Sequence, residues 1–234
     1  MDLDNKVTII TGATGGLGQT VSEVFYQAGA SLVLVGSRLD KVQALADGIG
    51  SDRLLAVGAN LADPAGAETV VAAALERFGR VDILLNLVGG FGGGTPLSQS
   101  NGDELNKMLD INLRTAYNMC RAAIKPMIAQ KWGRIVNFGS RDALHARPNY
   151  SAYAISKAGV LRLTEALAEE LKQYNITVNA IIPGAIDTEA NHQATPQADT
   201  SRWVKPATIA ETLLFLVRPE TAINGAAIPL YEQI

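Results

Sequence analysis

Cysteine and histidine, the side chains that most often carry metal and redox chemistry, are almost absent. The 234 residues include one cysteine, Cys120, and two histidines, His145 and His192. A single cysteine excludes an intramolecular disulfide framework and a zinc cluster held by thiolates. Two histidines far apart in the sequence argue against a histidine-rich metal site. We therefore expect no metal in the functional site.

The sequence also has no marked excess of charge and no long hydrophobic run. Lys and Arg number 20 and Asp and Glu number 23, which gives a net charge of −3. Nucleic acid and anionic membranes are therefore not expected as partners. No apolar run reaches the roughly 20 residues of a membrane span. The segment Met1–Lys6 lacks the basic and apolar regions of a secretory signal. We expect a soluble, cytoplasmic protein.

Short apolar runs alternate with longer helical patterns along the whole chain. The runs show little polar alternation, as strands buried on both faces do; they are Val7–Thr11, Ser31–Val35, Leu54–Ala59, Asp82–Val88, Arg134–Gly139, Ile176–Ile182 and Ala226–Leu230. The helical patterns lie at Leu17–Ala28, Lys41–Gly48, Ala65–Phe78, Leu105–Gln130, Ala152–Tyr174 and Ala207–Val217. The stretches Gly89–Gly94 and Glu189–Ser201 are expected to be loops. This order predicts an α/β fold: a single domain, residues 1–234, with a Rossmann-type doubly wound parallel sheet of about seven strands and helices on both faces.

A glycine-rich turn follows the first predicted strand and precedes a helix. Three of its four glycines, Gly12, Gly16 and Gly18, are spaced Gly-x-x-x-Gly-x-Gly, one residue longer than the usual dinucleotide fingerprint. Because glycine has no Cβ, backbone N–H groups can approach a pyrophosphate, and the helix N-terminus adds partial positive charge. Three glycines can also form a purely structural turn. The position at the first strand–helix junction favours a cofactor loop.

The residues after the second predicted strand bear on which dinucleotide is bound. An acidic residue that would bind the ribose 2′-hydroxyl is absent until Asp40, which is expected in the helix. Ser37 and Arg38 could instead hold a 2′-phosphate. The alternative is a solvated arginine at a helix start. The pattern favours NADP(H), with NAD(H) still possible.

Tyr153 and Lys157 stand four residues apart, which places both on one face of a predicted helix. A free tyrosine has a pKa of about 10 and is a poor acid or base at neutral pH. A nearby ammonium and a positively charged nicotinamide both favour the phenolate. We therefore expect the pKa of Tyr153 to be lowered. Alone, this pair could equally be part of a solvated helix face.

Six segments in order resemble the short-chain dehydrogenase/reductase family over nearly the whole chain. They are Gly12-x-x-x-Gly16-x-Gly18, Asn86-Leu87-Val88-Gly89, Asp110-Ile111-Asn112, Ile135–Ser140, Tyr153-x-x-x-Lys157 and Pro183-Gly184-x-x-x-Thr188. The resemblance implies an NAD(P)-dependent oxidoreductase that transfers hydride between nicotinamide and a carbonyl/secondary alcohol pair, acting on the CH–OH group of its donor.

The resemblance also implies roles for four residues. Tyr153 would be the general acid in reduction and the base in oxidation. Ser140 would hydrogen-bond the same substrate oxygen. Lys157 would lower the pKa of Tyr153 and hold the nicotinamide ribose. Asn112 would hold a water that links Lys157 to solvent. The plainer alternatives are a strand end for Ser140 and a helix kink for Asn112.

The dinucleotide contacts that the resemblance implies lie at strand ends throughout the chain. They are Gly12, Thr14, Gly15, Gly16, Leu17, Gly18, Ser37, Arg38, Asn60, Leu61, Asn86, Val88, Gly89, Tyr153, Lys157, Pro183, Gly184, Ile186 and Thr188. Asn60 stands where the family usually has Asp, and Asn86-Leu87-Val88-Gly89 lacks the family's second Asn. The glycine-rich turn has no basic residue, which argues against NADP, and the family's Asp-Gly-Gly tail is absent.

Substrate contacts are expected from the loops at the carboxyl ends of the strands. Phe91 could meet a planar substrate, and Ser140, Arg141 and His145 lie together in the sequence. A salt-bridged Arg141 and a surface His145 are the alternatives. The stretch 186–205 is expected to be a short substrate loop. The substrate is therefore expected to be a small carbonyl or alcohol compound.

Two further readings remain open. The stretches Gly89–Gly93 and Asp187–Trp203 resemble dihydropteridine reductase, although that enzyme lacks the Ser and Asn present here as Ser140 and Asn112. A quinonoid pterin reductase is therefore an alternative. The altered motifs also allow a non-catalytic dinucleotide-binding sensor. Family members are usually homotetramers or homodimers formed through the helices matching Leu105–Gln130 and Ala152–Tyr174, so the resemblance implies an oligomer.

Overall fold

The computed structural model describes residues 3–50 and 52–232. One sheet runs through these residues, with the strand order β3-β2-β1-β4-β5-β6-β7 and every neighbouring pair parallel. The strands are β1 (Val7–Thr11), β2 (Ser31–Gly36), β3 (Leu54–Gly58), β4 (Ile83–Asn86), β5 (Gly133–Phe138), β6 (Ile176–Pro183) and β7 (Ala227–Leu230). The predicted doubly wound parallel sheet is confirmed.

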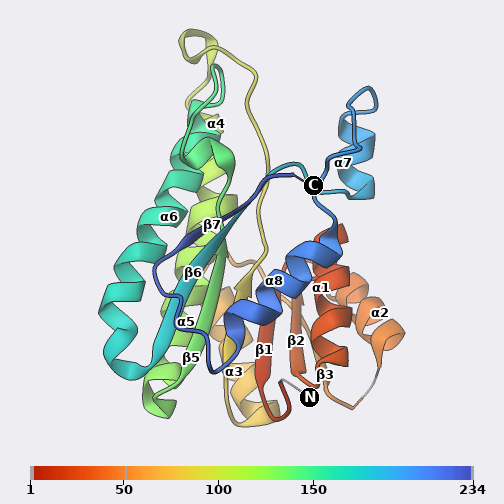
Figure 1. Ribbon diagram of the computed structural model, residues 1–234, viewed down its shortest axis with the longest axis vertical. Coiled ribbons are helices and arrows are strands. Elements are labelled where there is room, and N and C mark those ends of the chain that lie inside the picture. The colour runs from red at the N-terminus through yellow and green to blue at the C-terminus, as the bar shows by residue number, and fades with distance from the viewer. Residues whose placement is uncertain (1–2, 51, 233–234) are drawn as a thin grey trace.

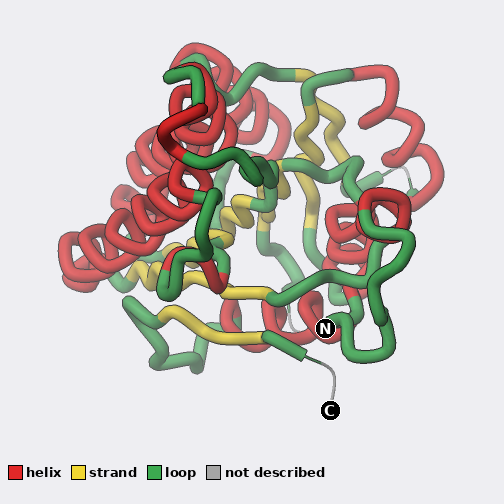
Figure 2. The backbone as a smooth tube through the Cα atoms, turned by 90° about the horizontal axis from the view of Figure 1, so that it is seen from above, coloured by secondary structure: helices red, strands yellow, loops and turns green. Residues whose placement is uncertain are grey.

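Helices cover both faces of the sheet (Figures 1 and 2). The helices α1 (Gly16–Gln27), α2 (Leu39–Ile49) and α8 (Pro206–Val217) pack on one face, and α3 (Pro64–Phe78), α5 (Thr115–Gln130) and α6 (Ser151–Leu171) on the other. Consecutive strand residues enter opposite cores: Ile10 packs against the first group and Ile9 against the second. Because both faces are buried, the strands show no polar alternation.

Two segments differ from their predicted form. The single helix expected over Leu105–Gln130 is α4 (Asp103–Met108), a π-helical turn η2 (Leu109–Arg114) and α5. The stretch Glu189–Ser201, expected to be a loop, begins with helix α7 (Glu189–Ala194). This short helix has no buried face, and the Thr188 side chain caps it by accepting from the Asn191 N–H.

The segments that carry most of the predicted functional residues follow the carboxyl ends of the strands. Figure 1 shows the loop before α4 and helix α7 rising from the same end of the sheet, on opposite sides. Three short 3-10 helices, η1 (Leu97–Gln99), η3 (Arg141–Ala143) and η4 (Lys172–Tyr174), lie in the connections. Since parallel strands end at one edge, residues distant in the sequence meet there.

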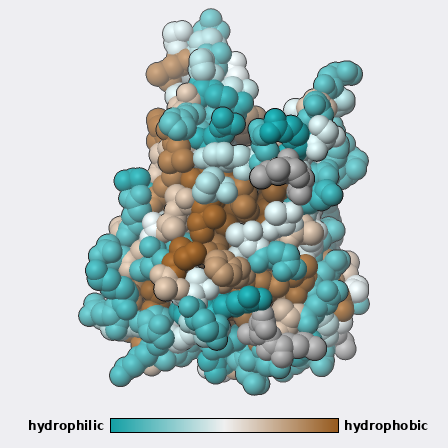
Figure 3. All heavy atoms as spheres, viewed as in Figure 1, coloured by the Kyte–Doolittle hydropathy of each residue, from teal (hydrophilic) through white to brown (hydrophobic). Residues whose placement is uncertain are grey.

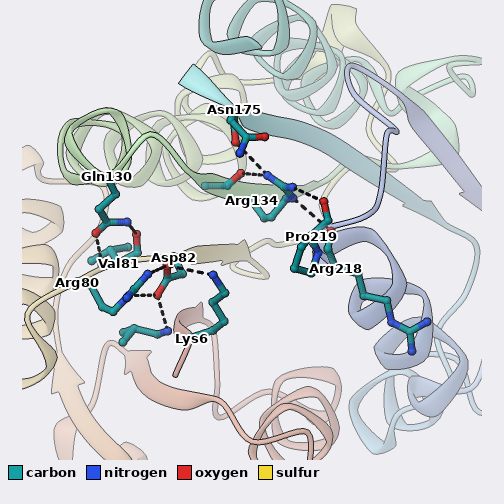
Figure 4. Close-up of polar contacts among 11 residues, drawn as sticks. Lys6, Arg80, Val81, Asp82, Gln130, Arg134, Asn175, Arg218 and Pro219 are labelled. Atoms are coloured by element: carbon teal, nitrogen blue, oxygen red, sulfur yellow. Dashed lines mark hydrogen bonds and ion pairs between the residues drawn. The ribbon is translucent and has the colours of Figure 1, made fainter. Parts of the chain in front are cut away.

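A buried carboxylate joins the opposite, amino-terminal ends of the strands (Figure 4). Asp82, which has no exposed surface, accepts the Val7 N–H at 2.9 Å and two Arg80 hydrogen bonds at 2.7 Å each. Lys6 Nζ lies 3.9 Å from the same carboxylate. Burial is the largest cause that lowers the pKa of Lys6. These hydrogen bonds and ion pairs compensate the buried charge of Asp82, far from the carboxyl ends of the strands.

Arg134, also buried, makes the second such cluster (Figure 4). Its guanidinium donates to the backbone carbonyls of Asn175 and Pro219, each at 3.1 Å, and lies 4.5 Å from the Trp132 ring. Burial lowers its pKa. These bonds tie the start of β5 to the segments before β6 and after α8, and so stabilise the fold rather than the carboxyl edge.

The last strand leaves an apolar face open. Along β7 the residues alternate between exposed and half-buried, and Phe215 of α8 is 49% exposed. Figure 3, seen from the same side as Figure 1, shows apolar atoms gathered near the middle of this face. In the part of the chain that the structure describes, no helix has both the length and the hydropathy to cross a membrane.

Candidate active site

The glycine-rich turn after β1 is shaped by close backbone contacts. Gly12 has a φ of +67°, a conformation that favours glycine. A Cβ on Gly18 would lie 2.3 Å from the Gly12 carbonyl oxygen, so only glycine fits there. Gly15 is the N-cap of α1 and has no side chain to accept from the first-turn N–H groups. These N–H groups and the helix N-terminus form a site suited to an anion.

The structure brings the C-terminal part of the chain to this turn. A Cβ on Gly16 would lie 3.1 Å from the Thr188 side chain, so the two residues are neighbours. Thr188 follows Pro183 and Gly184 at the end of β6, where the Gly184 N–H donates to the Leu230 carbonyl. A bridge between Ile186 and Val204 closes the base of the 186–205 segment.

Lys157 and Asn112 converge from different elements. The Lys157 ammonium, buried on α6, donates to the Phe138 carbonyl at 2.8 Å. Lys157 Nζ and Asn112 Oδ1 each lie 3.1 Å from the position that a Gly89 Cβ would take. Burial lowers the pKa of Lys157 from 10.5 to about 8. Gly89 therefore leaves the space in which these two polar groups face each other.

Asn112, in the π-helical turn η2, is hydrogen-bonded to the loop after β4 and to helix α6. Its Oδ1 accepts the Gly90 N–H at 2.9 Å, and its Nδ2 donates to the Gly90 carbonyl and to Ser156 Oγ, each at 3.0 Å. Single π turns are frequent at functional sites. The wide turn thus joins the loop after β4 to helix α6.

Tyr153 lies one helical turn before Lys157 and is 9% exposed. Burial raises its pKa most, a hydrogen bond with Ser140 lowers it, the charge of Asp142 raises it further and Arg147 lowers it. The pKa of Tyr153 is therefore raised, contrary to the expectation of a lowered pKa. The physical reason is that burial outweighs the attraction of nearby positive charge.

An aromatic ring from the loop after β4 covers Tyr153. The Phe91 ring lies 5.0 Å from the Tyr153 ring, edge to face, and 5.3 Å from the Tyr150 ring, stacked. Phe91 is still 62% exposed. The Gly94 N–H donates to the Asn149 carbonyl at 2.8 Å, which fixes this loop to the one before α6. The Phe91 ring therefore lies beside the phenol, and its contact with a substrate stays a prediction.

Arg141 and His145, the other expected substrate contacts, are exposed on the loop that begins at Ser140. The Arg141 guanidinium lies 5.3 Å from the ring of Tyr231, and its carbonyl accepts the His145 N–H. The structure brings neither side chain against Tyr153. Whether a substrate reaches them stays a prediction.

Arg38 pairs with an acidic neighbour at the start of α2. Its Nε and Nη2 donate to the two Asp40 oxygens at 3.2 and 2.5 Å, and both side chains are exposed. This hydrogen bond is the largest cause that raises the pKa of Arg38 and lowers that of Asp40. Ser37 precedes the pair, and Thr14 lies close to Gly36 at the end of β2. Arg38, which is expected to bind a 2′-phosphate, is therefore paired with the carboxylate of Asp40.

The residues expected near the adenosine are divided between the surface and the core. Asn60 Oδ1 accepts the Ala62 N–H at 3.2 Å, and the Leu61 carbonyl accepts from Asn118 at 2.9 Å. Asn86 is buried, and its Nδ2 donates to Asn137 Oδ1 at 2.8 Å. The Asn86 amide oxygen, also buried, has no hydrogen-bond partner among the residues that the structure describes.

Val88 completes the contact between the loops after β1 and β4. Its N–H donates to Thr11 Oγ1 at 3.3 Å, and a Cβ on Gly12 would lie 3.1 Å from the same nitrogen. Leu17, half-buried in α1, packs against the core between the sheet and helices α1, α2 and α8. Within residues 3–50 and 52–232, no group of three His, Cys, Asp or Glu side chains could hold a metal ion.

A model of the family described as short chain dehydrogenase matches residues 6–199. The chain belongs to the short-chain dehydrogenase/reductase family. Three similar proteins and one solved structure illustrate the range of its relatives. The 3-oxoacyl-(acyl-carrier-protein) reductase FabG of Thermotoga maritima is 30% identical over 240 residues, covering 97% of each chain. D-threitol dehydrogenase of Mycolicibacterium smegmatis is 34% identical over 236 residues, covering 96% of this chain and 90% of the relative.

Oxidoreductase UcpA of Salmonella typhimurium is 40% identical over 189 residues, covering 80% of this chain and 71% of the relative. The crystal structure of levodione reductase has a TM-score of 0.91 at 29% identity, covering 98% of this chain and 97% of the other. The predicted family is confirmed, and the chain is an oxidoreductase of the short-chain family, whose members bind nicotinamide cofactors.

The residues of this short-chain family member fit a dinucleotide. Gly12 has a positive φ, and Gly18 lies too close to backbone carbonyls to carry a Cβ, so both positions require glycine. The N-terminus of α1 follows, and no N-cap side chain occupies its N–H groups. Gly89 leaves room beside Lys157 and Asn112. These features match the close approach of a pyrophosphate and a ribose.

Sequence reasoning missed two residues of this site. It did not single out Asp142, which the structure places beside Ser140, or Ser156, the partner of Asn112. Opposite charges at Asp142 and Arg147, five residues apart in a short loop, were the one available signal. Ser156 lies between Tyr153 and Lys157 and gave no signal of its own.

Proposed function

We propose that the protein is an NAD(P)-dependent reductase or dehydrogenase that interconverts a carbonyl group and a secondary alcohol, with Tyr153 as general acid/base. The observation that carries the proposal is the convergence of Tyr153, Ser140, Lys157 and Asn112 at one edge of the sheet. A buried phenol whose pKa is affected by a serine hydroxyl, with a buried ammonium one helical turn away, is suited to moving a proton.

A bound nicotinamide supplies or accepts the hydride, and the protein handles the proton. In reduction the Tyr153 phenol donates its proton to the substrate oxygen; in oxidation the phenolate accepts one. Ser140 donates a hydrogen bond to the same oxygen and stabilises its developing charge. Lys157, with a pKa lowered to about 8, can reprotonate the phenol near neutral pH. Asn112 lies beside Lys157, where it would hold a water of the proton path.

The dinucleotide would be held by the turn from Gly12 to Gly18 at its pyrophosphate and by Lys157 at the nicotinamide ribose. Thr188, beside Gly16, would contact the carboxamide. NADP(H), held at its 2′-phosphate by Ser37 and Arg38, is the proposed nucleotide, with NAD(H) as the alternative. The Arg38–Asp40 ion pair lies where a 2′-phosphate would compete for the guanidinium.

A small molecule with a carbonyl or hydroxyl group is the proposed substrate. Phe91 beside Tyr153 supports a planar or cyclic compound. The names of the relatives include two reductases and a dehydrogenase, consistent with this reaction class. We propose residues 1–234 as one nucleotide-binding domain and 186–205 as its substrate loop.

The decisive experiment replaces Tyr153 by Phe. Tyr153→Phe removes the proton donor but keeps the ring that packs on Phe91. We expect turnover with a ketone panel to fall roughly 100- to 10,000-fold while nucleotide affinity is retained. Tyr174→Phe, at the far end of α6 in η4, is the matched control and should leave turnover unchanged. Full activity of Tyr153→Phe would refute the mechanism.

The exposed Phe91 ring also supports a second candidate, reduction of a quinonoid pterin. Such a substrate is planar and would stack on Phe91. NADPH oxidation measured with ketones, diketones, quinones and quinonoid pterins distinguishes the two activities. Nucleotide binding without turnover on any of these compounds would instead support a sensor.

A homotetramer or homodimer is the proposed assembly. The outer surface of η2, α5 and α6 has a groove of about 520 Å³, and its lining includes Leu113, Tyr117 and Leu163. Apolar grooves between exposed helices are suited to a second copy. Light scattering after size exclusion should give a multiple of the 24.7 kDa chain mass, and a 24.7 kDa species would exclude the assembly.

A further inference from the structure

An ion pair that the reaction above does not use lies beside Ser140. Asp142, in η3, is 8% exposed. Arg147 Nε and Nη2 donate to its two oxygens at 2.7 and 3.0 Å. A carboxylate bound in this two-point manner has a fixed orientation. Asp142 is therefore a buried, ordered charge rather than a surface residue.

Asp142 is directed at the catalytic hydroxyl. Its backbone N–H donates to Ser140 Oγ at 3.2 Å, and its Oδ2 lies 3.5 Å from the same oxygen, at the outer limit of a hydrogen bond from Ser140. The Ser140 hydroxyl in turn acts on Tyr153, because it lowers the pKa of the phenol. The carboxylate is thus separated from the phenol by one hydroxyl group.

Arg147 connects the same carboxylate to the aromatic wall. Its Cζ lies 4.4 Å from the Tyr150 ring centroid and 5.7 Å from that of Phe91. A guanidinium over an aromatic face is attractive, most of all where water is excluded. One side chain therefore holds Asp142 and supports the rings that cover Tyr153.

Among the described residues, charged groups approach Tyr153 from two elements. Asp142 and Arg147 come from the loop before α6, and Lys157 lies one turn along α6 with its ammonium on the Phe138 carbonyl. Phe91, from the loop after β4, faces Tyr153 as a neutral ring. Asp142 raises the pKa of Tyr153 and Arg147 lowers it, after the larger effects of burial and Ser140.

We propose that Asp142, held by Arg147, is a positioning residue that orients the Ser140 hydroxyl and keeps the Tyr153 phenol in its proton-donating form. The inference rests on the proposed role of Tyr153. A carboxylate near the phenol disfavours the phenolate, and Arg147 limits this effect by neutralising the carboxylate. The site is thereby set for reduction, in which the phenol gives up its proton.

A direct titration of Tyr153 tests the proposal without turnover. The phenolate absorbance of the folded chain is followed against pH, and the same titration of Tyr153→Phe is subtracted, so that the signal of Tyr153 remains. Asp142→Asn removes the negative charge and should move the midpoint to lower pH. Arg147→Gln leaves the carboxylate without its partner and should move the midpoint to higher pH.

Two further variants separate charge from structure. Arg147→Lys keeps the positive charge and should stay closer to the parent midpoint than Arg147→Gln. The double variant Asp142→Asn/Arg147→Gln should return toward the parent value, because both charges are gone. Glu165→Gln is the matched control: its partner Arg162 is exposed, and the pair lies more than two turns further along α6. It should not move the midpoint.

The pH profile of turnover gives an independent readout. In the reduction direction, the alkaline limb should move to lower pH in Asp142→Asn and to higher pH in Arg147→Gln. Shifts of both variants in the same direction, or no shift in either readout, would overturn the proposal. Retained activity of Tyr153→Phe would instead overturn the proposed function, so the two failures are distinguishable.

Discussion

The replacement of Gly18 by alanine probes the proposed phosphate site most sharply. An added Cβ would meet the Gly12 carbonyl oxygen at 2.3 Å and the Ala13 carbonyl oxygen at 2.7 Å. Real Cβ atoms essentially never come closer than 3.0 Å to another atom, so the Gly12 carbonyl must retreat by about 0.7 Å (3.0 minus 2.3). Both obstacles are backbone, and neither can rotate away as a side chain would.

The size of the effect follows from that displacement. Overpacking of this kind typically destabilises a fold by about 1–3 kcal/mol. A turn moved by this distance should lose at least one hydrogen bond to a phosphate, worth roughly 1.5–3 kcal/mol. That loss corresponds to nucleotide binding weaker by about 10- to 150-fold. Gly16→Ala should have a smaller effect, because its Cβ would meet only the Thr188 side chain at 3.1 Å.

Dinucleotide affinity by fluorescence and stability by urea unfolding are measured on the same variants. Gly133→Ala is the control for instability alone: its Cβ would meet the Met127 sulfur at 2.6 Å, at the opposite edge of the sheet. Gly48→Ala, with no atom within 4 Å, should stabilise α2 by about 0.5–1 kcal/mol. Parent-like affinity in Gly18→Ala, or an equal loss in Gly133→Ala, would refute the reasoning.

Three further outcomes are expected. Asp40→Asn should release Arg38 and raise kcat/KM for NADPH relative to NADH; an unchanged ratio would remove Arg38 from the phosphate contact. Lys157 loses its proton at about pH 8 when folded but only near 10.5 when unfolded, so the parent gains stability as pH rises between these values. The stability advantage of Lys157→Met over the parent should therefore shrink by roughly 2–3 kcal/mol between pH 7 and pH 10, and a constant difference would contradict the lowered pKa. Asp82→Ala should cost about 1–3 kcal/mol in urea unfolding with unchanged nucleotide affinity, since it leaves the buried Val7 N–H without its acceptor, far from the site.

Features that depend on neighbouring residues could be predicted from the sequence. The run Val7–Thr11 matches β1 because a short apolar segment bounded by polar residues has few alternatives to a buried strand. Gly79 ends α3 with a φ of +74°, a conformation that glycine adopts without strain. The four-residue spacing of Tyr153 and Lys157 likewise placed both on one helix face.

Features that depend on distant partners could not be predicted. The π-helical turn is held by bonds from Asn112 to Gly90 and Ser156, which are 22 and 44 residues away in the sequence. No local pattern distinguishes it from an ordinary helix. The pairing of Arg38 with Asp40 is local, two residues apart, but it could not be predicted either, because the same arginine could face solvent or a phosphate.

The bonds between Asn112 and Gly90 also limit how the loop that carries Phe91 can move. Both the N–H and the carbonyl of Gly90 are bound to one amide group, and Ile111, next in the chain and 38% exposed, lies against the same glycine. A ligand that lifts Phe91 from Tyr153 must therefore bend the loop beyond Gly90 or pull on the helix as well. Because the Gly94 N–H also donates to the Asn149 carbonyl at 2.8 Å, the loop is fixed on both sides of Phe91, and the first motion would have to fall at Gly92 and Gly93.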